Sequence, residues 1–280
     1  MNRISSYIRR TLQGMYPPEE VNALVMMIYC DILKLDALDI YLGKDIQLSE
    51  SKQGELENII GRLQNNEPIQ YIRGTADFCG RTFYVAPGVL IPRPETAELV
   101  ELIAKENVNA DSIRVLDIGT GSGCIAISLA KYFLKADVTA WDVSGDALKI
   151  ACRNNEALRA QVRFVEQDVF SDIAFNENGY DIIVSNPPYI TESEKQMMES
   201  NVLDWEPETA LFVPNDEPLR FYDRIAEVGQ KILNPDGKLY FEINQAYGDK
   251  TACMLETKGY RNIRVIKDFY KRDRIVTANK

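Results

Sequence analysis

Short apolar segments alternate with helical patterns from residue 113 onward, and this alternation constrains the fold more than any other feature of the sequence. Strands are predicted at residues 113–118, 137–141, 162–166, 180–185 and 238–243, and the helices at 124–132, 144–158 and 218–233. Strands that alternate with helices form parallel sheets with helices on both faces. Residues 260–268 and 274–277 are predicted to close the sheet as an antiparallel pair. The fold class is therefore α/β.

The residues before this region have a different character. Apolar residues at helical spacing predict a helix containing Ile4, Ile8 and Leu12, a second helix from Pro17–Pro18 to about Leu35, and a third capped by Ser49 or Ser51. We expect residues 1–70 to form a small helical domain that docks the substrate. Aromatic residues and glycines then predict a β-hairpin linker over residues 71–92, and residues 93–280 form the sheet domain.

Composition excludes several classes of function. The chain has 280 residues, with 32 basic against 42 acidic side chains and a formal charge of −10. Because non-specific affinity for nucleic acids comes mainly from Lys and Arg, no stable nucleic-acid binding is expected. The chain has no histidine. Zincin motifs and Ser-His or Cys-His nucleophiles are thereby excluded, and no metal is expected.

The cysteines and the apolar segments point to a reducing compartment. The five cysteines show no C-x-x-C spacing, which is typical of buried thiols and not of a disulfide framework or a zinc site. The apolar run from Ala23 to Cys30 is too short to span a membrane. Arg9 and Arg10 are followed by polar residues and not by the apolar core of a signal peptide. We therefore predict a cytoplasmic protein with no membrane partner.

A glycine-rich loop follows the first predicted sheet strand. The segment Gly119-Thr120-Gly121-Ser122-Gly123 comes directly after Asp117-Ile118 and before a helix. Glycines there let the backbone approach a ligand closely. The dinucleotide fingerprint requires Gly or Ala at position 124, where this chain has Cys124, and the Lys-Ser/Thr pair of a P-loop is missing.

Two further carboxylates follow later strands. Asp142 lies about 20 residues beyond the glycine loop, the spacing at which an acidic residue reaches a ribose diol, although Asp142 or Ser144 would serve equally as a helix N-cap. Asp168 could accept from an adenine amino group, or be a turn aspartate. Together with Asp117 they describe a nucleoside pocket at the carboxyl edge of the sheet. S-adenosylmethionine fits a pocket without phosphate-binding features.

The strand at 180–185 stops abruptly at Asn186-Pro187-Pro188-Tyr189. Pro187 disfavours helical backbone at Asn186, and both prolines lack an N–H. Asn186 Oδ1 and the Pro187 carbonyl can therefore act as acceptors beside the aromatic face of Tyr189. Two acceptors and a flat ring suit a planar –NH2 group, but these four residues alone fit a strand-ending turn equally well.

Taken together, these motifs resemble the peptide chain release factor N5-glutamine methyltransferases, a family of class I S-adenosylmethionine-dependent methyltransferases. Residues 116–123 resemble motif I of that class, and 186–189 resemble its amino-methylating signature. The run Pro92-Arg93-Pro94-Glu95-Thr96 after a helical domain narrows the resemblance. It extends to further segments at 70–74, 206–207 (Glu-Pro) and 241–243 (Phe-Glu-Ile).

The resemblance implies a Rossmann-like methyltransferase sheet, S-adenosylmethionine as the methyl donor and release factors as the protein substrate. It further implies a site that contains two groups of residues. The residues expected to be catalytic are Asn186, Pro187 and Tyr189, and the same three with Pro188 are expected to bind the substrate. The residues expected to bind the cofactor are Asp117, Gly119, Thr120, Gly121, Ser122, Gly123, Asp142, Asp168, Val169 and Asn186.

The chain departs from the family pattern outside the two central motifs. Ala97 stands where an acidic residue is common, Asn244 and Lys271 stand where glycine is usual, and residues 213–218 replace a glycine-rich segment. These departures affect the expected conformation of surface loops and the expected fit of the substrate, but not the expected reaction.

The reaction implied is methylation of the side-chain amide nitrogen of glutamine in the Gly-Gly-Gln motif of a release factor. Three alternatives stay open at this point. They are methylation of a ribosomal protein glutamine, N6-adenine methylation of nucleic acid with base flipping, and a non-catalytic S-adenosylmethionine-binding partner of the translation machinery.

Overall fold

The computed structural model describes residues 2–110, 112–173 and 179–280. The chain divides into two compact units. One comprises residues 1–74 together with 199–205, and the other comprises residues 75–198 and 206–280. No helix within the described ranges is long and apolar enough to cross a membrane.

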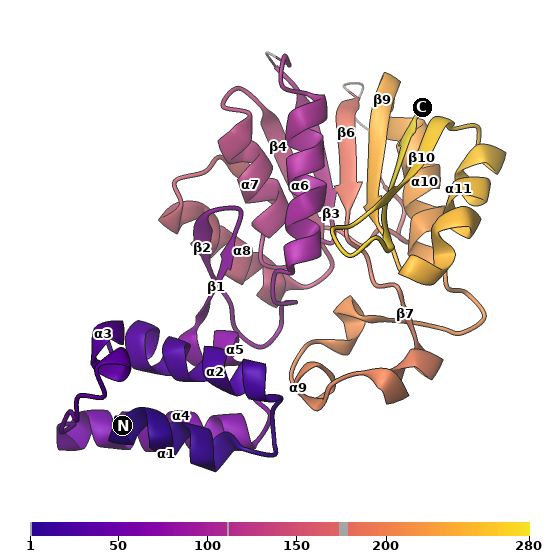
Figure 1. Cartoon of the computed structure of the whole chain (residues 1–280). Helices are drawn as coiled ribbons and strands as arrows, with labels where there is room; N and C mark the ends of the chain where they lie inside the picture. The colour runs from indigo at the N-terminus through magenta and orange to yellow at the C-terminus, as the bar shows by residue number, and fades with distance from the viewer. Residues whose placement is uncertain (1, 111, 174–178) are drawn as a thin grey trace. The chain divides into compact units, whose positions relative to one another are not determined.

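The N-terminal unit is helical (Figure 1). Its elements are α1 (Arg3–Leu12), α2 (Pro18–Met26), a π-helical segment (Met27–Ile32), α3 (Ala37–Tyr41), α4 (Glu50–Gln64), α5 (Ile69–Arg73) and α9 (Ser200–Leu203). Ser49 caps α4 by accepting from Lys52 N. Ile4, Ile8 and Leu12 face the unit's own core, as their helical spacing predicts. Substrate docking by this unit stays a prediction.

The short segment 199–205 is the one part of this unit that comes from far along the chain. The Trp205 indole donates from Nε1 to the Asn65 carbonyl oxygen at 3.1 Å, just after the end of α4. No local sequence pattern indicates this pairing, because the two residues are separated by 140 positions.

The second unit is built on a seven-stranded sheet in the order β10-β11-β9-β6-β3-β4-β5 (Figure 1). Its strands are β3 (Arg114–Ile118), β4 (Asp137–Asp142), β5 (Val162–Glu166), β6 (Tyr180–Ser185), β9 (Leu233–Glu242), β10 (Arg261–Lys267) and β11 (Asp273–Asn279). The five strands from β9 to β5 are parallel, and β11 is antiparallel to both β9 and β10. The predicted sheet with an antiparallel closing pair is confirmed.

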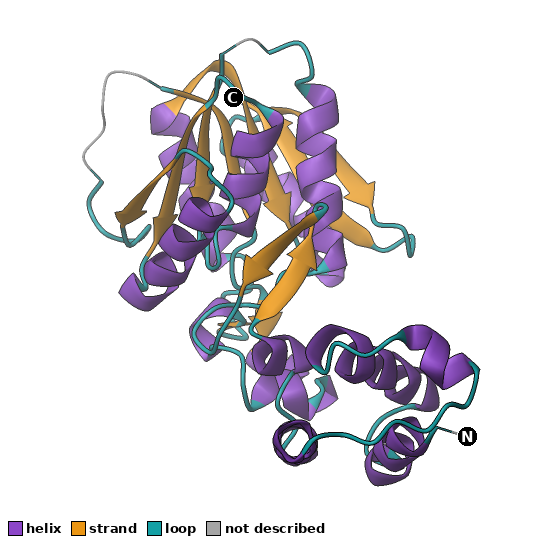
Figure 2. Cartoon of the chain, turned by 90° about the vertical axis from the view of Figure 1, so that its left-hand side faces the viewer, coloured by secondary structure: helices purple, strands orange, loops and turns teal. Residues whose placement is uncertain are grey.

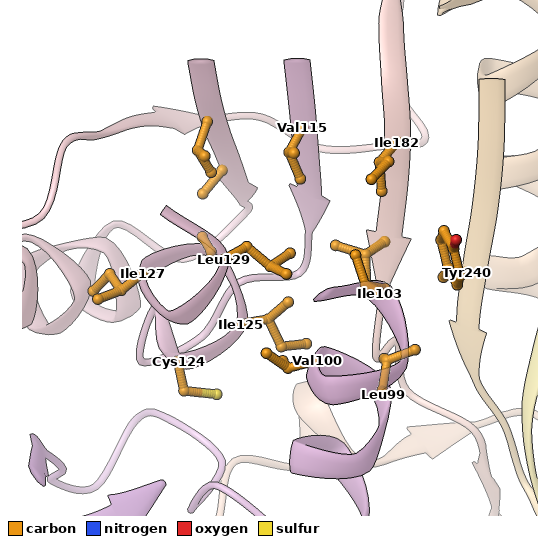
Figure 3. Packing of buried hydrophobic residues seen from close by; sticks show 14 of the residues in the cluster. Leu99, Val100, Ile103, Val115, Cys124, Ile125, Ile127, Leu129, Ile182 and Tyr240 are labelled. Carbon is orange, nitrogen blue, oxygen red and sulfur yellow. The ribbon is translucent and has the colours of Figure 1, made fainter. Parts of the chain in front are cut away.

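Helices cover both faces of this sheet (Figure 2). On one face, α6 (Pro94–Glu106) and α7 (Cys124–Tyr132) pack on β3, β6 and β9; Figure 3 shows Leu99, Val100 and Ile103 beside Ile125 and Val115. On the other face, α10 (Arg220–Ile232) packs on β9, and α11 (Gly248–Thr257) packs on β10 and β11. The middle residues of the central strands are mostly apolar because both faces of the sheet are buried.

Two small β-elements flank the sheet. The hairpin β1–β2 (Thr75–Phe78 and Arg81–Tyr84) is clamped by Asn154 of α8 (Gly145–Ala157). Asn154 accepts from Tyr84 N and donates to the carbonyl oxygens of Tyr84 and Ser122. Within the predicted hairpin segment 71–92, the residues before Gly74 are helical and those after Tyr84 are loop. The parallel pair β7 (Ile190–Thr191) and β8 (Phe212–Val213) lies beyond the end of β6.

One glycine of the loop after β3 is required by packing. Gly123 has φ of 81°, and a Cβ there would lie 2.9 Å from Ile127 Cδ1 and 3.2 Å from Ala151 Cβ. Gly123 therefore permits the close approach of α7 and α8.

Substituting this glycine is expected to destabilise the fold. Gly123→Ala should lower the free energy of unfolding by about 2–6 kcal/mol, because left-handed backbone strain and overpacking each cost about 1–3 kcal/mol. Gly259→Ala is the matched control: its φ is 85°, and its nearest neighbour is Gln230 Nε2 at 4.0 Å. Urea unfolding measures both variants. Equal losses would show that backbone strain alone matters at Gly123.

Candidate active site

Sheet register brings the ends of the parallel strands to one edge. Ile118 of β3 pairs with Trp141 of β4 and with Ser185 of β6, and Ser185 pairs with Phe241 of β9. The segments that follow these residues therefore meet at the carboxyl edge of the sheet, where open α/β proteins bind ligands. The glycine loop, Asp142 and Asn186 all begin from this edge.

The glycine loop is held against β4 by its backbone. The amides of Gly119 and Thr120 both donate to the Trp141 carbonyl oxygen, at 2.9 and 3.0 Å. Gly119 and Gly121 have positive φ, and a Cβ on either would project into open space. The loop is thus a cradle bare of side chains at these two positions, shaped to receive a ligand closely.

Asp117 lies behind this loop and is fully buried. Its Oδ2 accepts from Thr120 Oγ1 at 2.7 Å and from Ala126 N at 3.2 Å, while Oδ1 has no hydrogen-bond partner among the described residues. Burial raises the pKa of Asp117 to about 7. The structure therefore makes Asp117 the residue that ties the loop to the start of α7.

This buried carboxyl predicts a pH-dependent stability. The folded protein holds the Asp117 proton up to about pH 7, whereas the unfolded chain releases it near pH 4. The folded state therefore binds more protons in this window, and its stability falls as pH rises through it. Asp117→Asn keeps a hydrogen-bond acceptor but cannot ionise. The difference in free energy of unfolding between this variant and the parent should therefore shift in favour of the variant by about 4 kcal/mol from pH 4 to pH 8, at about 1.4 kcal/mol per pKa unit.

Urea unfolding across this pH range measures the effect. Substitution of the exposed Asp216 with Asn is the control and should leave the pH profile of stability unchanged. Parallel profiles for the parent protein and Asp117→Asn would contradict the prediction.

Asp142 is fixed by two backbone amides. Oδ2 accepts from Gly121 N at 2.8 Å and Oδ1 accepts from Ser144 N at 2.9 Å. Ser144 is the N-cap of α8, so the helix cap predicted at Asp142 or Ser144 is Ser144. Asp142 connects the glycine loop to the start of this helix. Burial raises the pKa of Asp142, against the effect of these amides.

Asp168 follows β5 and is exposed, with Oδ1 accepting from Phe170 N at 2.9 Å. The neighbouring Val169 is buried, and the Val169 carbonyl oxygen accepts a hydrogen bond from Arg224 Nε. Phe170 packs edge-to-face on Phe221 with ring centroids 5.1 Å apart. The aromatic pair was not among the residues that the sequence indicated, because Phe221 lies in the distant helix α10.

Asn186 begins a chain of hydrogen bonds that crosses three elements. Its Nδ2 donates to Thr96 Oγ1 at 3.2 Å, and Thr96 donates to Glu242 Oε2 at 2.6 Å. Tyr189 donates from its hydroxyl to Glu242 Oε1 at 3.1 Å. Glu242 is buried, which raises its pKa, and the Arg274 guanidinium opposes this by favouring the charged form. Thr96 and Glu242 belong to two of the segments that carry the family resemblance, but the sequence alone indicates no role for either residue.

Two further contacts hold the segments around Asn186. Arg93 donates to Glu206 Oε1, and Glu206 Oε2 accepts from Ile91 N at 3.1 Å. Asn244 donates from Nδ2 to the Tyr189 carbonyl oxygen at 3.2 Å and to the carboxylate of Glu194. Asn244, although outside the central motifs in sequence, therefore contacts one of them in space.

These groups surround a cavity of about 430 Å³, a size typical of small-molecule sites. Most residues predicted for the site line it: Gly119, Thr120, Gly121, Ser122, Asp142, Asp168, Val169, Asn186, Pro187 and Pro188. Asp117, Gly123 and Tyr189 do not line it and act behind the wall. Arg93, Thr96, Phe170 and Phe221 are also among the residues that line the cavity. No group of three or more potential metal ligands occurs within the described ranges.

Comparison with known structures supports the fold. A methyltransferase from Pyrococcus furiosus superimposes with a TM-score of 0.54 over 80% of this chain and 98% of its own, at 20% identity. The T. thermophilus 16S rRNA N2 G1207 methyltransferase, solved in complex with AdoMet and guanosine, covers 74% of this chain and 49% of its own with a TM-score of 0.52 at 20% identity. The sheet domain therefore has the methyltransferase fold.

Sequence comparison is more specific. Residues 5–74 match the PrmC N-terminal domain family and residues 95–204 match the methyltransferase small domain family. The release factor glutamine methyltransferase of Bacteroides thetaiotaomicron is 68% identical over the full length of both chains. That of Flavobacterium psychrophilum is 41% identical over 96% of this chain and 95% of its own. The chain belongs to the release factor glutamine methyltransferase family.

Proposed function

We propose that this protein transfers a methyl group from S-adenosylmethionine to the side-chain amide nitrogen (N5) of the glutamine in the Gly-Gly-Gln motif of peptide chain release factors. The observation that carries the proposal is the placement of Asn186 and Pro187 in the wall of the same cavity as the glycine loop. An amide receptor beside a nucleoside-type cradle fits methyl transfer to an amide. The names of the two relatives above support the choice of substrate.

The residues of the cavity suit S-adenosylmethionine. Gly119 and Gly121 form a cradle open at the Cβ positions, and the carboxylates of Asp142 and Asp168 supply acceptors for a ribose diol and an adenine amino group. Val169 and Phe170 add an apolar wall. When bound, S-adenosylmethionine supplies an electrophilic methyl carbon attached to a positively charged sulfur.

The role of Asn186 and Pro187 is to accept hydrogen bonds from the glutamine amide. An amide nitrogen is a poor nucleophile because its lone pair is delocalised, as the rotation barrier of about 18–20 kcal/mol indicates. Acceptors on both N–H groups fix the orientation of that nitrogen and favour the state in which it carries positive charge. Pro188 lines the cavity beside them, and Tyr189 excludes water from behind the wall.

No strong base is required of the protein. The amide nitrogen becomes acidic as it gains positive charge, so its proton can pass to solvent water without a side chain of matched pKa. This suits a chain that has no histidine.

A labelling assay with three substrates tests the proposal. The full-length protein is incubated with S-adenosylmethionine labelled in its methyl group and with a purified release factor, with ribosomal proteins, or with DNA and RNA. We expect label in the release factor alone, located by mass spectrometry on the glutamine of Gly-Gly-Gln. Label in ribosomal proteins or nucleic acid would support the competing substrates, and no transfer to any of them would indicate a binding protein.

A further inference from the structure

The hydroxyl of Thr96 lies between an amide and a carboxylate. It accepts from Asn186 Nδ2 at 3.2 Å and donates to Glu242 Oε2 at 2.6 Å. Thr96 is buried at 3% exposure, in the first turn of α6 two residues after Pro94. It therefore sits on a rigid helix start, and it contacts two residues that lie 90 and 146 positions further along the chain.

Proton counting fixes the direction of these bonds. A threonine hydroxyl has one proton to donate, and a carboxylate can only accept. Because the Thr96 proton goes to Glu242, only the lone pairs of Thr96 Oγ1 can face Asn186. Asn186 must then turn its Nδ2 toward Thr96, which leaves Oδ1 directed away from Thr96. An amide rotated by 180° would set an oxygen lone pair against the Thr96 lone pair.

We infer that Thr96 and Glu242 are positioning residues that hold the Asn186 amide in the orientation that presents an acceptor to the substrate. The inference rests on the proposed function, in which Asn186 Oδ1 accepts from the glutamine –NH2 group. The two orientations of an asparagine amide have the same shape, so packing alone distinguishes them poorly. The hydrogen bond to Thr96 selects one amide orientation, because the Thr96 proton is donated to the Glu242 carboxyl group.

The same carboxylate also orients the other end of the motif. Glu242 Oε1 accepts from the Tyr189 hydroxyl, and the positive charge of Arg274 favours the charged form of Glu242. Arg274 is itself held by Asp268, with Nε 3.2 Å from Oδ2. One buried carboxyl group thus aligns Asn186, through Thr96, and Tyr189 directly.

Thr96→Val tests the inference, because it preserves the shape of the side chain and removes only the hydroxyl. We expect kcat for release factor methylation to fall about tenfold or more, as for the loss of a bond that acts mainly in the transition state. The KM for the release factor should stay within about twofold of the parent. Thr96→Ser restores the hydroxyl and should recover kcat to within about threefold. Thr96→Ala provides a second removal if the valine variant does not fold.

Thr251→Val is the matched control, since Thr251 is also fully buried but its Oγ1 has no partner among the described residues. It should keep the parent kcat. A kcat loss below about fivefold in the removal variants overturns the inference, as does a serine variant that stays impaired or a loss shared by Thr251→Val. An inactive parent protein would instead contradict the proposed function, so the two failures are distinguishable.

Discussion

Asn186→Ala is expected to lower kcat for release factor methylation by about 10²–10³-fold, the usual effect of removing one preorganised hydrogen-bonding group at a reacting centre. The variant loses the Oδ1 acceptor and leaves the Thr96 hydroxyl without its donor. Binding of S-adenosylmethionine should stay measurable, because the glycine loop, Asp142 and Asp168 are untouched. Single-turnover kinetics with a labelled methyl donor measure the loss, and calorimetry measures the affinity.

Asn155→Ala serves as the control for this experiment. Asn155 likewise makes a side-chain hydrogen bond, in which its Oδ1 accepts from Val162 N at 3.2 Å, but it does not line the cavity. Its kcat should equal that of the parent. Retained turnover in Asn186→Ala would refute the assignment of Asn186 as the amide receptor.

Asp142→Asn is expected to weaken S-adenosylmethionine binding by about 10- to 100-fold. The two carboxylate oxygens accept from two different backbone amides, of Gly121 and Ser144. An asparagine can satisfy only one of them and sets its –NH2 group against the other. Each unsatisfied buried donor costs about 1–3 kcal/mol, and the charged acceptor proposed for the ribose diol is also lost.

Asp146→Asn is the control for this second variant. Asp146 lies nearby in the first turn of α8, but it is exposed and bonds Lys149. Calorimetric titration with S-adenosylmethionine should give the parent dissociation constant for Asp146→Asn and a raised one for Asp142→Asn. Unchanged binding in both would remove Asp142 from the cofactor site.

Local patterns predict the central strands well. The strands at 162–166 and 180–185 have the predicted bounds, because each is a short apolar run closed by turn residues. Other bounds depend on tertiary contacts. Strand β9 begins at Leu233, five positions before the predicted start, although Pro235, Asp236 and Gly237 within it are turn-type residues. Pairing with β6 across a register shift accommodates them. Helix α11 was not predicted.

The site shows a similar division. The sequence indicates the glycine loop, Asp142 and Asn186, because each follows a strand that ends at the same edge. It does not distinguish a residue that lines the cavity from one behind it, and Asp117 proves to hold the loop from behind. The bonds from Thr96 to Asn186 and Glu242 span long distances in sequence, so only the fold reveals them.

The departures from the family pattern also gain a physical description. Lys271, where glycine is usual, has φ of 64° in the turn between β10 and β11. A non-glycine residue in this region carries backbone strain. Asn244, by contrast, makes side-chain hydrogen bonds that a glycine could not make. Nothing in the structure explains Ala97.

The helical unit is formed by two separate segments of the chain, and this has a consequence for chimeric proteins. Because residues 199–205 belong to the same compact unit as residues 1–74, an exchange of the N-terminal segment alone between two relatives would separate Trp205 from the carbonyl of its native residue 65. A functional graft must therefore carry both stretches from the same parent. The helical unit of this chain is thus discontinuous in sequence, and a graft of residues 1–74 alone would leave out the segment 199–205.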